Sequence, residues 1–232
     1  MADRAFYEKF RTTPQGQALL RMIRYAEGTE RGGPDSYRVM FGGGLAPDLK
    51  QHPDKVITGG GYSSSAAGAY QFLTPTWQQQ QKKLGLQSFG PVEQDIAALD
   101  LARQRTMGLG GLSYLQEKGL TPEFVAKLAP EWASLPTQQG KSYYGQPVKS
   151  YDELKKVYGQ QAATPVATTT TQQPQTTQAT TQAPEQTTPR YNIKDLMKAS
   201  LFQNLLNQIN QPSPTQGLIQ GFMSGAPLGM FK

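Results

Sequence analysis

Residues 24–29 (RYAEGT) and 66–71 (AAGAYQ) bound the stretch of sequence that decides the fold. Leu20, Ile23 and Glu27 are spaced three and four residues apart, so in a helix they share one face. A carboxyl group therefore stands where the pattern favours an apolar core residue. Gly28 follows at once, in the position where a left-handed residue commonly ends a helix. The sequence predicts a helix that ends at a glutamate on its buried face.

The position of Glu27 favours its protonated form. In the last helical turn, the negative end of the helix dipole disfavours another negative charge, and partial burial acts in the same direction. Arg24, one turn earlier, acts in the opposite direction. A carboxylic acid that stays partly protonated near neutral pH is what a general acid requires. The alternative is a helix-end glutamate that pairs with Arg24 or is solvated.

The composition limits the chemistry. The chain has 232 residues, enough for one well-formed domain with additions, and a formal net charge of +6 with a pI near 9.4. This charge suits a polyanionic partner, but no basic run interleaved with aromatic residues predicts a specific nucleic-acid groove. The chain has no cysteine, and its one histidine, His52, stands in a polar loop and is interpreted as structural. We therefore expect no metal ion and no cofactor.

Targeting and membrane segments are not predicted. The first residues contain no apolar run of the kind found in signal peptides. No stretch approaches the ~20 consecutive apolar residues that a membrane span needs. The chain is expected to reach its substrate by another route.

The first 159 residues predict helices around a small β region. Strands are expected at 37–41 and 55–58, each bounded by glycines. The glycine runs 42–44 and 59–61 are not followed by Gly-Lys-Ser/Thr and have no βαβ context, so a nucleotide site is rejected. Helix starts are expected near Asp3 and at Thr13-Pro14, Thr74-Pro75, Gly90-Pro91, Thr121-Pro122 and Ser150, the last with Glu153 as a capping box and Gly159 as its end.

These elements predict an α+β fold that is mainly helical, with a small antiparallel β lobe and a cleft between two lobes. In the helix that starts at Pro91, a stripe that includes Val92, Ile96 and Leu99 is expected to be buried. Pro130 is expected to separate a short helix that carries Trp132. An apolar neighbourhood places Trp132 in the core rather than against a sugar.

Six short blocks follow one another along the chain: LRMIRYAEGT (20–29), YRVMFGG (37–43), HPDKVIT (52–58), GAYQ (68–71), WASLP (132–136) and YGQ (144–146). In this order they resemble the phage lambda-type lysozymes, over residues 15 to 158 of this chain. The resemblance implies a lysozyme-like fold. It also implies the chemistry of a lytic transglycosylase, which cleaves the MurNAc-β-1,4-GlcNAc bond of peptidoglycan and leaves a 1,6-anhydro ring.

The resemblance also implies a set of site residues. The catalytic glutamate of the family falls on Glu27. Tyrosine–glutamine pairs offer an aromatic face and an amide that both donates and accepts hydrogen bonds, which suits N-acetylated sugars. A half-buried packing role is the alternative for each tyrosine. Family position favours substrate contacts at Gly68, Tyr70, Gln71, Tyr144 and Gln146.

The reaction type depends on a second carboxyl group. In the transglycosylase route, Glu27 protonates the glycosidic oxygen, and the resulting carboxylate then deprotonates the C6 hydroxyl that attacks the anomeric carbon. A hydrolase instead needs a partner carboxylate across the bond. The loops offer Glu30, Asp35 and Asp48, and no pattern marks any of them as that partner.

The composition changes abruptly after Gly159. Residues 160–190 are rich in Thr, Gln and Pro with little apolar bulk, and are interpreted as a disordered linker. Residues 191–232 predict an amphipathic helix capped by Asn192, followed by an apolar tail. A short amphipathic helix cannot form a core alone, so this segment is expected to bind phage structural proteins; a membrane-surface helix is the competing interpretation. Its apolar stripe comprises Ile193, Leu196, Met197, Leu201, Leu205 and Ile209.

These observations predict a peptidoglycan-degrading lytic transglycosylase. Its expected partner is the peptidoglycan glycan strand, and its expected place is the tail or interior of a phage particle, with action in the host periplasm or cell wall. One alternative is a hydrolytic muramidase that waits in the host cytoplasm for holin-mediated release. Another is a non-catalytic virion protein that only binds peptidoglycan, which the presence of Glu27 argues against.

Overall fold

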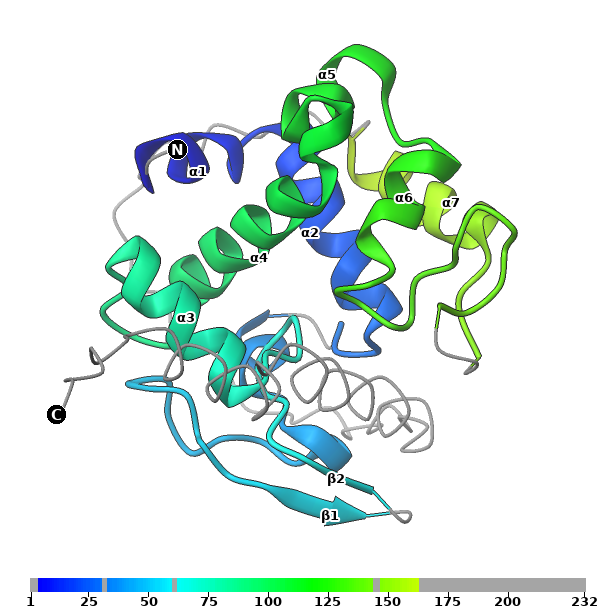
Figure 1. Ribbon diagram of the computed structural model, residues 1–232. Helices are drawn as coiled ribbons and strands as arrows, with labels where there is room; N and C mark the ends of the chain where they lie inside the picture. Colours follow the sequence, from blue (N-terminus) through cyan, green and yellow to red (C-terminus); the bar gives the residue numbers. More distant parts are fainter. Residues whose placement is uncertain (1–3, 31–32, 60–61, 144–146, 163–232) are drawn as a thin grey trace, which may run out of the picture.

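The central element of the fold is α4 (Pro91–Thr106), a helix with buried residues around most of its circumference. The computed structural model describes residues 4–30, 33–59, 62–143 and 147–162 (Figure 1). Within this part, α4 packs against α1 (Arg4–Phe10), α2 (Pro14–Ala26), α3 (Thr74–Leu84) and α6 (Pro122–Leu128). Ile96 and Leu99 are buried as predicted, whereas Val92 is 38% exposed, and the polar residues Glu93 and Gln94 beside it are buried in its place.

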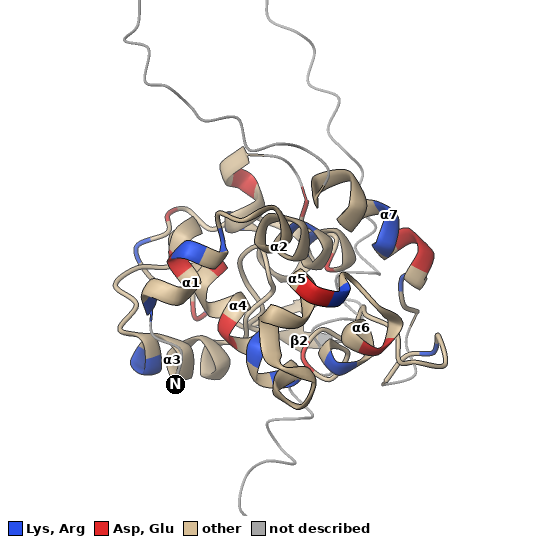
Figure 2. Cartoon of the chain, turned by 90° about the horizontal axis from the view of Figure 1, so that it is seen from above, with Lys and Arg blue, Asp and Glu red and all other residues tan. Residues whose placement is uncertain are grey.

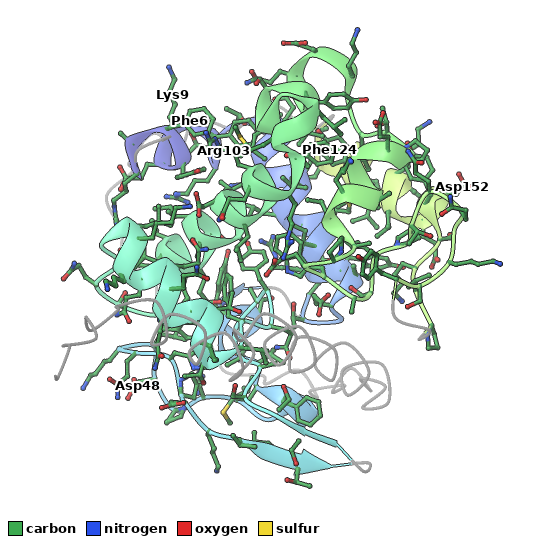
Figure 3. The ribbon with its side chains drawn as sticks, viewed as in Figure 1. Phe6, Lys9, Asp48, Arg103, Phe124 and Asp152 are labelled. Carbon is green, nitrogen blue, oxygen red and sulfur yellow. The ribbon has the colours of Figure 1, made fainter. Side chains whose placement is uncertain are left out.

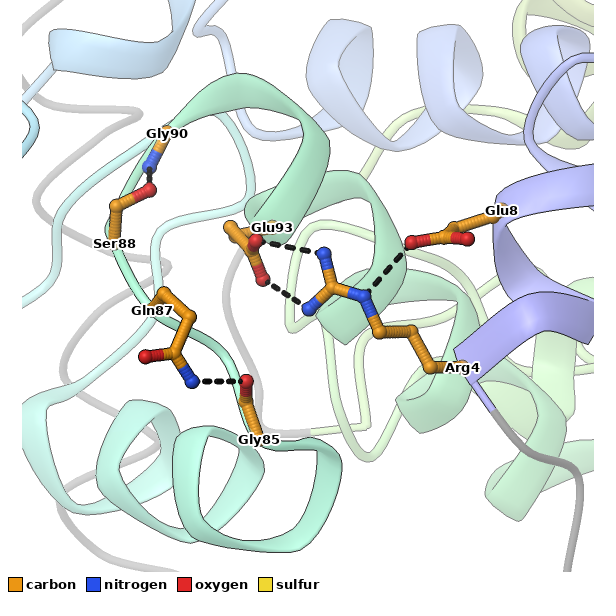
Figure 4. A network of polar contacts seen from close by, with 7 residues as sticks. All are labelled: Arg4, Glu8, Gly85, Gln87, Ser88, Gly90 and Glu93. Carbon is orange, nitrogen blue, oxygen red and sulfur yellow. Dashed lines mark hydrogen bonds and ion pairs between the residues drawn. The ribbon is translucent and has the colours of Figure 1, made fainter.

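A bidentate ion pair attaches α1 to the start of α4. Both terminal nitrogens of Arg4 donate to the Glu93 carboxylate, at 2.9 and 2.8 Å, while Arg4 Nε donates to Glu8 (Figure 4). Farther along α4, the buried Asp100 accepts hydrogen bonds from Tyr7 on α1 and from Lys83 on α3. These contacts join three helices through two carboxyl groups of α4.

The helix that carries Glu27 begins and ends as the sequence predicts. Thr13 is the N-cap of α2, and its Oγ1 accepts from the Gly16 backbone N–H at 3.0 Å. Pro14 occupies the first turn, where its missing N–H has no helical partner to lose. At the other end, Gly28 has φ +69°, the left-handed conformation that stops the helix.

The second half of the described chain is helical and closes over α2. It comprises η3 (Met107–Leu109), η4 (Gly111–Ser113), α5 (Tyr114–Lys118), α6 and α7 (Tyr151–Ala162). α7 packs along α2 (Figure 1). The predicted capping box is confirmed, because Ser150 and Glu153 exchange hydrogen bonds at 3.0 and 3.2 Å.

Two helix predictions in this half are wrong. α7 does not end at Gly159 but continues to Ala162, which is partly buried against the main core; a glycine inside a helix costs only about 0.5–1 kcal/mol, so Gly159 does not by itself stop the helix. Trp132 lies in turns after Pro130 rather than in a short helix. The predicted burial of Trp132 is confirmed, with 2% of its surface exposed.

The β region is smaller than the sequence predicts. β1 (Ile57–Gly59) and β2 (Tyr62–Ser64) form a two-stranded antiparallel sheet in which Thr58 pairs with Ser63, at the end of the molecule away from α5 (Figure 1). The strand predicted at 37–41 is instead divided between η1 (Gly33–Arg38), isolated bridges and η2 (Phe41–Gly43). Gly42 and Gly43, at φ +80° and +90°, turn the chain before a longer strand can pair.

The helical body and the β region each have an apolar cluster. The large one fills the helical body, and the small one, Phe41, Ala66 and Leu73, lies beneath the sheet. His52 is structural, as predicted: its ring lies edge-on to Phe89 and its Nε2 bonds to the Phe72 carbonyl at 2.9 Å. The mainly helical α+β architecture with a small antiparallel sheet is therefore confirmed.

Charged residues of both signs lie on α1, α5, α6 and α7, as Figure 2 shows. Among the helices in the described ranges, none has the length and apolar character required to cross a bilayer. The helix predicted from Asn192, and the predicted linker beyond Ala162, lie outside the described residues.

Candidate active site

Glu27 occupies the C-cap of α2, where its backbone N–H still donates to the Ile23 carbonyl at 2.9 Å. The side chain points into the protein, and only 4% of the residue is exposed. Arg24 does not pair with it. The Arg24 guanidinium lies instead near the Tyr37 and Tyr70 rings and donates to the Tyr70 hydroxyl at 2.9 Å. Neither the paired nor the solvated alternative for Glu27 describes this residue.

Burial raises the pKa of the Glu27 carboxyl group from 4.5 to about 7, and a hydrogen bond from Ser134 opposes part of that rise. Ser134 Oγ donates to Glu27 Oε1 at 2.5 Å. A carboxyl group with a pKa near 7 is protonated in a large fraction of molecules at neutral pH. Glu27 can therefore hold a proton in the pH range in which a glycosidase acid works.

Five carboxyl-bearing residues are buried in the described part of the chain, and Glu27 differs from the other four. Each of those four has an ion pair with an arginine or lysine, at 2.6 to 3.7 Å. In the same part of the chain, the Glu27 carboxyl group has one hydrogen-bond partner, the uncharged Ser134. The four ion pairs are Glu93 with Arg4, Asp95 with Arg11, Asp100 with Lys83, and Glu131 with Arg105.

Ser134 was not among the predicted site residues. It lies 107 positions from Glu27 in the sequence, so no helical or strand periodicity connects the two. The available signal was its place in the WASLP block, two residues after a tryptophan that was correctly assigned to the core. The block contributes to the family resemblance, but packing is the only role that the sequence predicts for a residue within it.

Gly68 shapes the turn between the sheet and α3. It has φ +81°, and a Cβ built on it would lie 2.3 Å from Gln94 Oε1. That oxygen accepts from the Ala69 backbone N–H at 2.8 Å, so the turn is held directly against α4. Glycine at this position allows the close approach. In the structure, Gly68 allows the turn to pack against α4. Its predicted contact with substrate stays a prediction.

The structure places Tyr70 in the interior, and its predicted sugar contact stays a prediction. The residue is 1% exposed, and its hydroxyl donates to Asp95 Oδ1 at 2.5 Å. Tyr37 donates to the same oxygen at 3.0 Å. With its ring covered and its hydroxyl bound to Asp95 and Arg24, Tyr70 joins the turn to α2 and α4. The packing alternative describes this tyrosine better.

Gln71 retains a free acceptor. Its backbone has φ +50°, a conformation that is uncommon for residues other than glycine and often found at functional sites. Its side-chain Nε2 donates to the carbonyls of Val39 and Gly68, at 3.1 and 3.0 Å. Its Oε1 is buried and has no hydrogen-bond partner among the described residues. The amide is therefore fixed in orientation, with one buried oxygen that accepts no hydrogen bond from the described residues.

The other predicted contacts and carboxylates are placed as follows. Tyr144 and Gln146 lie outside the described residues. Glu30 pairs with Arg21 at 2.7 Å and Asp35 with Arg38 at 3.3 Å. Asp48 lies toward the end that carries the sheet and accepts from the Lys50 N–H (Figure 3). Three or more His, Cys, Asp or Glu side chains do not gather into a metal-ion site anywhere in the described ranges.

Comparisons with known proteins match this same part of the chain. A family model described as Endolysin matches residues 17–165. The endolysin of Escherichia phage lambda is 35% identical over 127 residues, 53% of this chain and 77% of that protein. The endolysin of Escherichia phage P2 is 33% identical over 112 residues, 48% of this chain and 62% of that protein. The structure of bacteriophage lambda lysozyme complexed with a chitohexasaccharide aligns with a TM-score of 0.56 and 31% identity, over 64% of this chain and 94% of that one.

Proposed function

The chain belongs to the endolysin family and is a peptidoglycan-cleaving enzyme, and we propose that it acts as a lytic transglycosylase with Glu27 as its catalytic acid and base. The observation that carries the proposal is the contrast among buried carboxyl groups. Glu27 is buried without a basic partner in the described part of the chain, and its pKa is raised to about 7. A structural carboxylate is normally paired, whereas a general acid must retain its proton.

The proposed reaction has two proton transfers at one carboxyl group. Neutral Glu27 donates its proton to the oxygen of the MurNAc-β-1,4-GlcNAc bond as the bond to the anomeric carbon breaks. The carboxylate that remains accepts the proton of the MurNAc C6 hydroxyl as that oxygen attacks the anomeric carbon. The products are a 1,6-anhydro-MurNAc end and a GlcNAc end with a free 4-hydroxyl group. Glu27 finishes protonated, so no external proton is consumed.

The state of the other candidate carboxylates supports this route over hydrolysis. Hydrolysis needs a second carboxylate near the bond, as nucleophile or as base for water. Glu30 and Asp35 are ion-paired, and Asp48 caps a backbone N–H. Each of the three therefore has a local role that explains its presence.

Substrate recognition is proposed for Gln71, Tyr144 and Gln146. For Gln71, the support is the fixed amide with its free Oε1. For the other two, the support is the resemblance of the YGQ block to the lambda-type family. The chitohexasaccharide complex of the lambda lysozyme also supports an N-acetylglucosamine polymer as the ligand class, because peptidoglycan shares the β-1,4 linkage and the acetamido groups.

Product analysis tests the reaction type. Purified sacculi digested in H₂¹⁸O should release 1,6-anhydro-muropeptides that contain no ¹⁸O at the anomeric carbon, as measured by mass spectrometry. Reducing MurNAc ends that carry ¹⁸O would show hydrolysis instead. That result would require one of the three loop carboxylates to act with Glu27.

Carriage in a phage particle is a separate part of the proposal. Its support is compositional: the family match ends at residue 165, and the sequence beyond it has a Thr/Gln/Pro-rich linker and an apolar stripe from Ile193 to Ile209. We expect a chain truncated after Ala162 to cleave sacculi as fast as the full chain but to be absent from purified particles. The cut belongs after Ala162 rather than Gly159, because α7 continues to that residue. Equal incorporation of both chains would contradict carriage through residues 191–232.

A further inference from the structure

We infer that Ser134 is a positioning residue for catalysis, which fixes the acid proton of Glu27 on Oε2 and so determines the oxygen that faces the glycosidic bond. The inference rests on the proposed role of Glu27. Its geometric basis is the 2.5 Å hydrogen bond from Ser134 Oγ to Glu27 Oε1. No second hydrogen-bond partner of this carboxyl group occurs in the described part of the chain.

The direction of that hydrogen bond separates the two carboxyl oxygens. A neutral carboxyl group has one carbonyl-type oxygen that accepts well and one hydroxyl oxygen that donates. Among the described residues, Glu27 Oε1 is the one acceptor for the Ser134 hydroxyl; the hydroxyl therefore donates to it, Oε1 takes the accepting role, and the proton belongs on Oε2. After proton transfer, the same bond stabilises the negative charge on Oε1 and leaves Oε2 free to act as the base. One serine therefore serves both halves of the reaction.

Ser134 is itself held from two directions. Its carbonyl accepts from the Lys149 backbone N–H at 3.0 Å, next to the capping box that starts α7. Two residues earlier, Trp132 Nε1 donates to the Tyr70 carbonyl at 3.4 Å. Thr29 Oγ1, just after Glu27, donates to the neighbouring Ala69 carbonyl at 2.5 Å.

These contacts make a closed ring of three segments. The end of α2 bonds to the turn at 68–71, that turn bonds to 132–135, and 132–135 bonds back to α2 through Ser134 and Glu27. Each segment is fixed by the other two, so the serine hydroxyl is preorganised rather than recruited by substrate. Lys149 Nζ above the Tyr25 ring at 5.2 Å and the Tyr25–Glu153 hydrogen bond at 3.3 Å further join α2 to the start of α7.

The test compares Ser134→Ala with Ser134→Thr, which keeps the hydroxyl group. For each full-length variant, two quantities are measured: the pH profile of kcat/KM on purified sacculi, and the titration of the Glu27 carboxyl carbon by ¹³C NMR, assigned with Glu27→Gln. Ser113→Ala is the matched control, because the exposed Ser113 hydroxyl donates to a backbone carbonyl within its own turn. If Ser134→Ala does not fold, Ser134→Cys takes its place, since a thiol has similar shape but donates weakly.

Loss of the donor should disfavour the charged form of Glu27. We expect Ser134→Ala to lower kcat/KM at neutral pH by about 10- to 100-fold, the loss that corresponds to a hydrogen bond to a charged group. In this variant, the alkaline limb of the pH profile of kcat/KM and the NMR titration midpoint of Glu27 should both move to higher pH by about one unit. Ser134→Thr and Ser113→Ala should keep the wild-type midpoint.

Two results would overturn the inference or separate it from the proposed function. A Ser134→Ala variant whose Glu27 titration and alkaline limb stay in place would overturn it, even if the rate falls, because a purely structural loss moves neither. A shifted titration together with a fully active Glu27→Gln variant would uphold the hydrogen bond but overturn the catalytic role of Glu27.

Discussion

Glu27 and Asp95 are equally buried, each 4% exposed, and they differ in what surrounds the carboxyl group. Asp95 accepts hydrogen bonds from Tyr70 and Tyr37 and forms an ion pair with Arg11. Glu27 has the hydroxyl of Ser134 as its one hydrogen-bond partner within the described ranges. The same chain thus contains one carboxyl group built for stability and one that keeps its reactivity.

The comparison shows that burial raises the pKa of a carboxyl group, and that the charged or hydrogen-bonding groups around it determine whether it serves stability or catalysis. Burial raises the pKa of both groups. At Asp95, the hydrogen bond from Tyr70 and the positive charge of Arg24 act against that rise and stabilise the carboxylate. At Glu27, a single neutral donor leaves the pKa at about 7. A buried carboxylate that is paired with a basic residue is a poor proton donor. A buried carboxyl group without a basic partner can donate a proton, but its ionisation destabilises the fold.

The largest expected effect is on catalysis. Glu27→Gln removes the exchangeable proton and keeps the shape, so cleavage of purified sacculi should fall by at least about 10²–10⁴-fold, the contribution typical of general acid–base catalysis. Glu30→Gln is the matched control, because Glu30 lies three residues away in a surface ion pair with Arg21 and should change the rate by less than about twofold. Clearing at a near wild-type rate by the Glu27 variant would remove Glu27 from the mechanism.

The next effect in size is on stability. Asp95→Ala leaves the Arg11 and Arg24 charges without their carboxylate and two tyrosine hydroxyls without an acceptor. The free energy of unfolding, measured by urea denaturation, should fall by about 3–5 kcal/mol. In the control, Asp35→Ala breaks an exposed ion pair with Arg38 and should cost less than about 1 kcal/mol. Similar losses in the two variants would erase the distinction between paired buried and paired exposed carboxylates.

The smallest effect is a dependence of stability on pH. Because the folded-state pKa of Glu27 lies above its unfolded value, the group stabilises the fold fully below pH 4.5, and this stability is lost as pH rises through about 7. Glu27→Gln does not titrate, so its stability relative to wild type should increase from pH 4 to pH 8 by up to about 3 kcal/mol. Parallel curves of unfolding free energy against pH for the two proteins would show that Glu27 ionises as easily in the folded state as in the unfolded one.

The local features of the site could be predicted from the sequence. Thr13-Pro14 predicted the start of α2, and the spacing of Ile23 and Glu27 followed by Gly28 predicted a buried carboxyl group at its end. Helix periodicity and caps depend on residues within one or two turns, so a single sequence contains the required information. The same reasoning gave the capping box of α7.

The long-range features could not be predicted in this way. The hydrogen bond from Ser134 to Glu27 spans 107 residues, and the Tyr70–Asp95 bond that buries a predicted sugar contact spans 25. The residues at 37–41 have strand-like side chains, yet the glycines that follow turn the chain before a partner strand is available. The first two outcomes depend on tertiary contacts rather than local preference, and the third depends on the backbone turns at Gly42 and Gly43.

The position of Trp132 gives the protein an intrinsic optical reporter. The chain contains two tryptophans, and both are buried. Trp132 lies two residues from Ser134 with its indole N–H bonded to the turn at Tyr70, whereas Trp77 packs against Phe72 and Phe89. Replacing Trp77 by phenylalanine would leave fluorescence emission from Trp132 alone. Occupancy of the neighbouring site by glycan could then be followed in real time without any attached dye.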